Sequence, residues 1–318
     1  MEGIRTGDSK QRGPTFILIV VGLAALLLPA CSLKRTAVNI LGEALAGGAG
    51  VYASDDDPEL IREALPFGLK TYESLLAESP GHRGLLLAAA GGFTAYAYLI
   101  QDDADRLDAT DLARARELRA RANKLYLRAR DYALRGLEAA HPAFRARLKR
   151  DAASALAMTT RDEAPLLYWA GVSWAGALTA AKDDFGLIGE LPIAEALVAR
   201  VLELEETFER GTAHEFFIAY EGSRPGCSAS LARQHYRRAL ELSGGRRASV
   251  HLALAESVSI GEQDLAEFRT LLAAASAVDP DEVPHQRLAN TIARRRARRL
   301  ETRIPDLFLG ADQAEEAK

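Results

Sequence analysis

The feature that most constrains this chain is the uncharged run APLLYWAGVSWAGALTAA, from Ala164 to Ala181, which holds both tryptophans. Pro165 suits the first turn of a helix, and Thr160 or Asp162 can cap that helix just upstream. A helix that is apolar on all sides is buried either in a large core or in a membrane. Because small residues fill much of the run and its tryptophans lie in the middle, we expect the core helix of a folded domain.

The composition indicates helix along nearly the whole chain. Hydrophobic residues make up 48% and charged residues 26%, so the chain can bury a substantial core. Alanine, leucine, arginine and glutamate dominate, and no stretch alternates as a strand would, which predicts an all-α fold. The net charge is −4 and the basic residues are spread along the chain, so nothing points to a nucleic-acid partner.

A weak internal repeat refines this prediction. Tetratricopeptide helix pairs place small, large or aromatic, small and proline residues at positions i, i+4, i+7 and i+12. The full or partial matches are Gly68-Tyr72-Leu75-Pro80, Ala122-Tyr126-Ala129, Ala232-Tyr236-Ala239 and Phe268-Leu272-Ala275-Pro280. Since the first three positions share one helix face, each central side chain can wedge against the next hairpin. We predict a single tetratricopeptide-like domain of stacked helical hairpins, an α-α superhelix, over residues 52–309.

The first 30 residues have the pattern of a lipoprotein signal peptide. A basic leader precedes a short apolar run, which ends in Leu28-Pro29-Ala30-Cys31. A small residue followed by cysteine is the bacterial lipobox, so we expect Cys31 to be acylated as the mature N-terminus. The alternative is an uncleaved anchor in which the cysteine is incidental. Ser32 in the next position favours the outer membrane, on its periplasmic face.

The ends of the domain are expected to be flexible. Residues 31–51 contain Gly47-Gly48-Ala49-Gly50, which we interpret as a joint in a lipidated tether, and residues 310–318 as a frayed tail. Cys227 is left as a free thiol.

No motif in the chain indicates catalysis. His214-Glu215 begins like the helix of a zinc protease, but Ile218 stands where the second ligand is needed. Ser173 lies in a sequence like a nucleophile elbow, yet inside a continuous helical run. The histidines form no metal-binding pair. We therefore expect no enzyme, no metal and no cofactor.

Two short aromatic runs form the candidate binding site. We expect the helices around residues 168–174 and 214–220 to line a shared cavity or channel for a small organic or apolar ligand. The candidate ligand-binding residues are Tyr168, Trp169, Trp174, His214, Glu215, Phe216 and Tyr220. The rings would form the walls, and the imidazole, the carboxylate and the hydroxyls would orient the ligand. The alternative is that these aromatics only fill the core.

Two charged clusters are expected at the surface. Asp102, Asp103 and Asp105 follow an apolar helix, and we interpret them as solvated acids at its end. The five arginines between Arg294 and Arg299 predict a solvated helix face, with an acidic partner or lipid headgroups as the alternative.

Several separated segments resemble one protein family, in the same order along the chain. They are SDDDPELIREALPFGLKTYESLLAESP, LLYWAGVSWAGAL, HEFF with Tyr220 and Pro225-Gly226, ARQHYRRALELSGG and RLANTIARRRARRLETRIPDLF. Together they resemble the TatT family, lipoproteins associated with TRAP (tripartite ATP-independent periplasmic) transporters. The resemblance runs from about Cys31 to Leu309; Cys227 departs from it, where a second glycine is expected.

The resemblance implies an all-α, tetratricopeptide-like fold, a homotrimer and a periplasmic solute-binding protein as partner, without catalytic activity. The expected function is that of an accessory lipoprotein of a TRAP-type uptake system. The sequence pattern alone leaves open a second function, a tetratricopeptide-like scaffold of the outer membrane that grips peptides or assembly partners.

Overall fold

The protein is described here by a computed structural model that covers residues 39–45, 47, 49–224 and 226–309. Among these residues there are helices and no strands, which confirms the all-α prediction. The expected signal peptide of residues 1–30, the acylated Cys31 and the tail of residues 310–318 lie outside the described residues. So does Pro225 in the expected turn.

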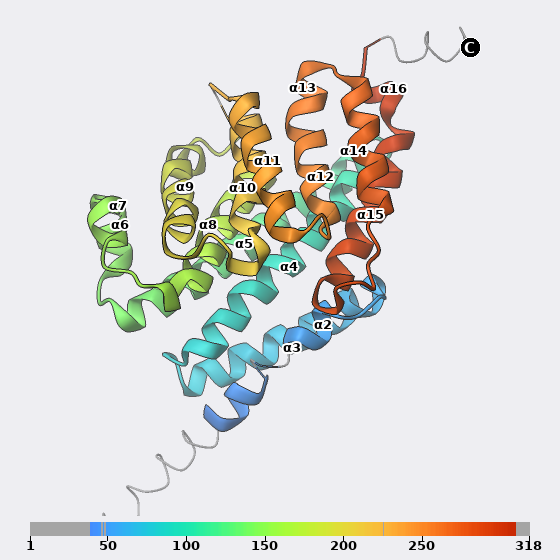
Figure 1. Ribbon diagram of the computed structural model, residues 1–318. Coiled ribbons are helices and arrows are strands. Elements are labelled where there is room, and N and C mark those ends of the chain that lie inside the picture. The colour runs from blue at the N-terminus through green and yellow to red at the C-terminus, as the bar shows by residue number, and fades with distance from the viewer. Residues whose placement is uncertain (1–38, 46, 48, 225, 310–318) are drawn as a thin grey trace, which may run out of the picture.

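The helices follow one another with short connections (Figure 1). In chain order they are α2 (Ala49–Ala53), α3 (Pro58–Glu78), α4 (Arg83–Leu107), α5 (Leu112–Ala140), α6 (Phe144–Arg150), α7 (Ala152–Leu156), η1 (Arg161–Glu163), α8 (Ala164–Ala180), α9 (Phe185–Glu205), η2 (Phe208–Arg210), α10 (Thr212–Ser223), α11 (Ala229–Ser243), α12 (Ala248–Leu254), the π-helical turn η3 (Ala255–Ser259), α13 (Ile260–Glu262), α14 (Leu265–Ala277), η4 (Pro284–Gln286), α15 (Arg287–Thr302) and α16 (Ile304–Leu307).

Local sequence signals explain where several of these helices begin and end. Asp57 caps α3 by accepting hydrogen bonds from the backbone N–H groups of Glu59 and Leu60, both at 3.0 Å, directly before Pro58. A capping box between Thr160 and Glu163 closes the turn that leads into α8. Such caps satisfy donors that have no partner inside the helix, so they fix the boundaries.

The tryptophan run forms α8, and it is a core helix as expected. Leu166, Leu167, Ala170 and Ala177 are fully or almost fully buried, because α8 packs against α4, α5 and α9. Glycines let these neighbours approach: a Cβ on Gly171 would lie 2.8 Å from the carbonyl oxygen of Ala194.

One helix of the described residues is long and apolar enough to cross a membrane. Within the described residues, α4 alone passes that test of length and composition, but 56% of its apolar window is buried inside the molecule. It packs against α3, α5 and α8, so core packing accounts for its apolar character.

Hydrophobic side chains gather in two clusters that meet at α10. The first cluster extends from α3 to α9 and includes Phe217, and the second extends from α11 to α16 and includes Ile218. Adjacent residues of one helix point about 100° apart, so α10 contributes to both clusters at once. Therefore α10, which carries His214, Glu215, Phe216 and Tyr220 of the candidate site, connects the two hydrophobic clusters.

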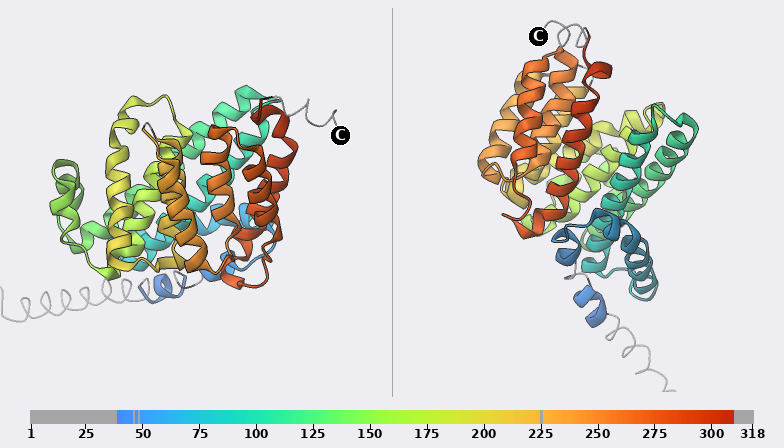
Figure 2. Two further views of the ribbon diagram at one scale, coloured as in Figure 1. Left: turned by 45° about the horizontal axis from the view of Figure 1, so that its top comes forward. Right: turned by 90° about the vertical axis from the view of Figure 1, so that its right-hand side faces the viewer.

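The C-terminal half returns to the N-terminal helices. Consecutive helices pair as hairpins, and α9 to α15 succeed one another across the molecule until α15 reaches α2 and α3 (Figures 1 and 2). The Arg287 side chain donates to the carbonyl oxygen of Ser54 at 3.2 Å, and Arg295 forms an ion pair with Glu59. Pairing of this kind is what hairpin stacking requires, but whether the hairpins are of the tetratricopeptide type stays a prediction.

The tyrosines of the repeat lie between helices to different degrees. Tyr72 and Tyr126 are buried, and Tyr126 occupies the space that a Cβ on Gly176 of α8 would fill. Tyr236 is partly buried and shares a hydrogen bond of 2.9 Å with His251.

Two segments differ in detail from what the sequence indicates. Gly47 and Gly50 of the expected joint are helical, and Tyr52, which follows them, places its hydroxyl against Gly68 of α3. The flexibility of the joint stays a prediction. α9 begins at Phe185, where Asp184 caps it, and it continues through Pro192.

Candidate functional site

The candidate site begins where α8 and α10 meet through a polar contact. The hydroxyl groups of Tyr168 and Thr212 share a hydrogen bond of 2.8 Å. Arg247, which precedes α12, donates to the Thr212 hydroxyl at 3.1 Å and to the Glu215 carboxylate at 2.7 Å. The same guanidinium donates to the carbonyl oxygen of Glu209 at 3.0 Å. One arginine from the second half of the chain thus links α8, η2 and α10.

The electrostatics of this contact favour a neutral tyrosine and a charged arginine. Burial, reinforced by the Glu215 carboxylate, raises the pKa of Tyr168 to about 12. Burial by itself would lower the pKa of Arg247, but Glu215 and Tyr168 outweigh it and the pKa is raised. Nε of Arg247 is buried and has no hydrogen-bond partner among the described residues. This buried N–H group can therefore donate a hydrogen bond to an additional acceptor.

A histidine pair lies on the next face of α10. Nδ1 of His214 lies 2.8 Å from Nδ1 of His235 on α11, so one ring donates and the other accepts. Nε2 of His214 lies 3.1 Å from Glu206, whose carboxylate accepts two hydrogen bonds from Arg238. Burial lowers the pKa of both imidazoles. The Arg238 hydrogen bonds lower the pKa of Glu206 to about 2, so the carboxylate is ionised beside a neutral pair.

The aromatic residues of α10 form a stack of their own. The Phe216 ring is stacked on the Tyr220 ring with centroids 5.8 Å apart. The Phe217 ring meets the Phe216 ring edge-on, with centroids 5.2 Å apart. The Tyr220 hydroxyl donates to the Glu195 carboxylate at 3.0 Å, and burial together with this hydrogen bond raises its pKa to about 12. This stack joins α10 to α9.

The two tryptophans have different environments. Trp169 is partly buried, packs on Gly91 of α4 and meets the Tyr168 ring edge-on at 5.1 Å. Trp174 is 1% exposed, and its indole N–H donates to Glu190 at 3.0 Å, with the Arg130 guanidinium 4.6 Å from its ring centroid. Trp169 therefore belongs with the α8–α10 contact, whereas Trp174 is packed among charged groups of α5 and α9.

The predicted site residues are thus brought together only in part. Glu215 binds Arg247, Tyr168 joins them through Thr212, and Trp169 meets the Tyr168 ring. His214 belongs to the histidine pair, and Phe216 and Tyr220 form the stack. Four partners that complete these groups were not predicted from the sequence: Thr212, His235, Glu206 and Arg247. His235 and Arg247 lie more than twenty residues beyond His214, and nothing in the sequence indicated that either would contact α10.

The surface is hollowed elsewhere. One hollow of 670 Å³ lies beside the N-terminal end of α4, and another of 480 Å³ lies between α3, α4 and α5. Neither is lined by a residue of the α8–α10 contact. Over the described part of the chain, no three histidine, cysteine, aspartate or glutamate side chains are grouped to hold a metal ion.

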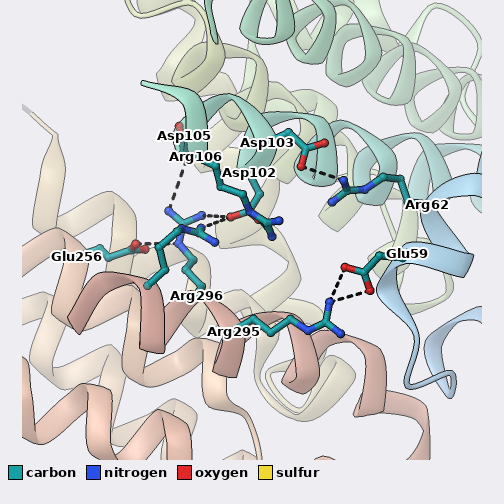
Figure 3. Close-up of polar contacts among 10 residues, drawn as sticks. Glu59, Arg62, Asp102, Asp103, Asp105, Arg106, Glu256, Arg295 and Arg296 are labelled. Carbon is teal, nitrogen blue, oxygen red and sulfur yellow. Dashed lines mark hydrogen bonds and ion pairs between the residues drawn. The ribbon is translucent and has the colours of Figure 1, made fainter. Parts of the chain in front are cut away.

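The acidic cluster on α4 was expected to be solvated, and that prediction was wrong. The helix extends to Leu107 instead of ending near Gln101, which places Asp102 in the interior with a side chain 1% exposed. Its carboxylate is bound by Arg106 at 2.7 Å and by Arg296 (Figure 3). Arg299 also binds it. A carboxylate is stable there because the surrounding guanidinium groups replace its water.

The arginine run on α15 was equally misjudged as a solvated face. Arg294 donates to the carbonyl oxygen of Ser276, Arg295 binds Glu59, and Arg296 binds Glu256 at 2.8 Å (Figure 3). Arg295 attaches the C-terminal half to α3, and Arg296 and Arg299 attach it to α4 through Asp102, whereas Arg294 stays within the C-terminal half. Arg298 is exposed, but the other four arginines of the run bind other segments, which the sequence of this helix alone could not reveal.

These features define an all-α protein built of helical hairpins. Ion pairs connect its C-terminal helices to α3 and α4, and polar and aromatic side chains connect α8, α9, α10 and α11. The family model described as "TRAP transporter T-component" matches residues 54–308, so the chain belongs to that family. An uncharacterized protein of Treponema pallidum (strain Nichols) is similar to this chain, with 28% identity over 308 residues that cover 90% of this chain and 95% of that relative. Membership of the family supports an accessory role in a TRAP system.

Proposed function

We propose that this protein is a lipid-anchored periplasmic T-component that docks the solute-binding protein of a TRAP system and holds a small organic or apolar ligand at the α8–α10 contact. The observation that carries the accessory role is the family match over nearly the whole helical domain. The anchor is Cys31, and the protein assembles as a homotrimer on the outer membrane. Its role is non-catalytic.

The ligand part of the proposal is supported by the chemistry of the α8–α10 contact. A site for a small organic molecule combines apolar walls with few polar groups that fix its orientation. Tyr168 and Trp169 supply ring surface, and Arg247 supplies a buried cation with an Nε–H that has no partner among the described residues. An organic acid would meet both features at one place.

Single-tryptophan variants test this part. In Trp174→Phe the remaining Trp169 should be quenched by acrylamide and should shift its emission when an organic acid such as benzoate binds. In the matched variant Trp169→Phe, Trp174 should resist quenching, because it is almost fully buried. If Trp169 also resists quenching and benzoate shifts neither variant, the aromatics only fill the core.

Docking is tested in the native host by chemical crosslinking and mass spectrometry with the tagged, membrane-anchored protein. The proposal expects a TRAP-type solute-binding protein among the crosslinked partners, with transporter genes beside this gene. Crosslinks only to outer-membrane assembly proteins would favour the scaffold function instead. Light scattering of the purified protein should give about three times the protomer mass, and a monomer would contradict the trimer alone.

A further inference from the structure

The hollow between α3, α4 and α5 combines an apolar floor with a basic rim. Ile100 and Leu107 from α4 and Leu118 from α5 provide aliphatic surface inside its 480 Å³. This volume is within the range of small-molecule sites, about 300–1,000 Å³. None of the residues of the α8–α10 contact lines it, so it is a separate feature of the molecule.

The basic rim follows from helix periodicity. Arg114, Leu118 and Arg121 are spaced i, i+4 and i+7 on α5, so they share one face, and this face borders the hollow. Arg62 from α3 and Arg106 from α4 complete a set of four guanidinium groups. Ile100 and Leu118 are buried and Leu107 is partly buried, so these cations surround an apolar floor that is itself mostly covered.

Acidic groups offset only part of this charge. Asp103 is the one carboxylate among the residues that line the hollow, and it pairs with Arg62 at 2.9 Å (Figure 3). Arg106 is held by Asp102, whose carboxylate is already shared with α15. Arg114 pairs at 2.7 Å with Glu117, but both side chains are exposed, so that ion pair is weak.

Arg121 has no carboxylate partner within the described residues. Its guanidinium donates to the Tyr96 hydroxyl at 2.8 Å and lies 5.5 Å from the centre of the same ring. Nε of Arg62 is buried and has no hydrogen-bond partner among the described residues. Arg121 is therefore a solvent-exposed cation without a carboxylate partner, and Arg62 has one buried N–H without an acceptor, so a carboxylate ligand can pair with both groups.

We propose that this hollow binds an amphipathic organic anion, with a carboxylate head at the basic rim and an apolar body on the floor of Ile100, Leu107 and Leu118. A guanidinium binds a carboxylate through two parallel hydrogen bonds, and Arg121 is the strongest candidate since no protein acid competes for it. The aliphatic floor adds a contact that inorganic anions cannot make. The proposal stands independently of the α8–α10 ligand.

Calorimetric titration of the purified, fully folded protein with octanoate tests the site. Acetate has the carboxylate without the long alkyl chain, and octanol has the alkyl chain without the carboxylate. Octanoate should bind, and each of the other two should bind at least about tenfold more weakly, because binding needs both kinds of contact. Acetate or octanol binding as tightly as octanoate, or no octanoate binding at all, would overturn the proposal.

Substitution places the binding in this hollow. Arg121→Ala should weaken octanoate binding about tenfold or more, the loss expected for one charged hydrogen-bonding partner. Lys124→Ala removes the same charge from an exposed position of α5 outside the hollow and should leave the affinity unchanged. Arg121→Lys keeps the positive charge but loses the two parallel N–H donors of the guanidinium, so its octanoate affinity should lie between those of the wild type and Arg121→Ala. This variant also tests the site if the alanine variant does not fold. Equal affinities in the Arg121 and Lys124 variants would refute the assignment.

Discussion

At the scale of single residues, two glycines of neighbouring helices have opposite roles. A Cβ on Gly171 of α8 would lie 2.5 Å from Val198 and 2.8 Å from the Ala194 carbonyl oxygen. A Cβ on Gly189 of α9 would meet nothing within 4 Å. Gly171→Ala should therefore lower the free energy of unfolding by about 1–3 kcal/mol through overpacking. Gly189→Ala should raise it by about 0.5–1 kcal/mol, because alanine is the better helix former. Urea denaturation at fixed protein concentration measures both, and equal stability of the two variants would show that α8 and α9 are not packed this closely.

The histidine pair predicts a pH dependence of stability. Burial lowers the pKa of His214 and of His235 below 6.5, so between that value and their folded pKa values the unfolded chain binds more protons than the folded one. Stability is complete above about pH 6.5 and falls as the pH decreases, at up to about 1.4 kcal/mol per pH unit for each imidazole. His235→Asn should flatten this fall relative to the wild type, and the same change at the exposed His285 should not. Denaturation midpoints measured between pH 7.5 and 5 decide, and parallel profiles for wild type and His235→Asn would contradict the neutral pair.

At the scale of helices, α15 is attached to α4 by a buried ion cluster and to α3 by an exposed one. Asp102 is buried among Arg106, Arg296 and Arg299, and its removal would leave Arg106 and Arg299 without this carboxylate, while Arg296 keeps its ion pair with Glu256. Asp102→Ala should therefore cost about 3–5 kcal/mol of unfolding free energy. Glu59→Gln breaks the exposed pair with Arg295 and should cost no more than about 1 kcal/mol. Hydrogen exchange should show α15 released in the first variant only; unchanged protection of α15 in Asp102→Ala would mean that apolar contacts alone hold it.

The same helices show what the sequence could predict and what it could not. The position and buried character of α8 followed from a run without charge. The end of α4 did not, because acidic residues after an apolar helix normally mark a solvated terminus. Asp102 continues the helix instead, since its counter-charges come from α15, almost two hundred residues later. Within the candidate site, the aromatic residues were recognisable by type, whereas Arg247 and His235 enter it only through the folding of distant segments.

At the scale of the whole molecule, the last long helix of the domain, α15, contacts residues near the start of the domain. Arg287 and Arg295 of α15 contact Ser54 and Glu59 near the start of the domain. These residues directly follow the segment that would connect the domain to its anchor. The C-terminal half is therefore held close to the start of the helical domain.

The anchor itself is tested by comparing the two cysteines. Cys31 ends the signal-peptide pattern, whereas Cys227 is an exposed free thiol of the folded domain. One acyl chain gives only marginal membrane binding, at about 0.8 kcal/mol per buried CH₂, so a stable lipoprotein needs at least two chains on its N-terminal cysteine. Cys31→Ala should then yield an unprocessed precursor or a soluble protein, while Cys227→Ala should fractionate with the membrane like the wild type. Membrane fractionation and mass spectrometry of the mature N-terminus measure this directly. A processed, membrane-bound Cys31→Ala protein would show that something other than an acylated cysteine holds the T-component at its membrane.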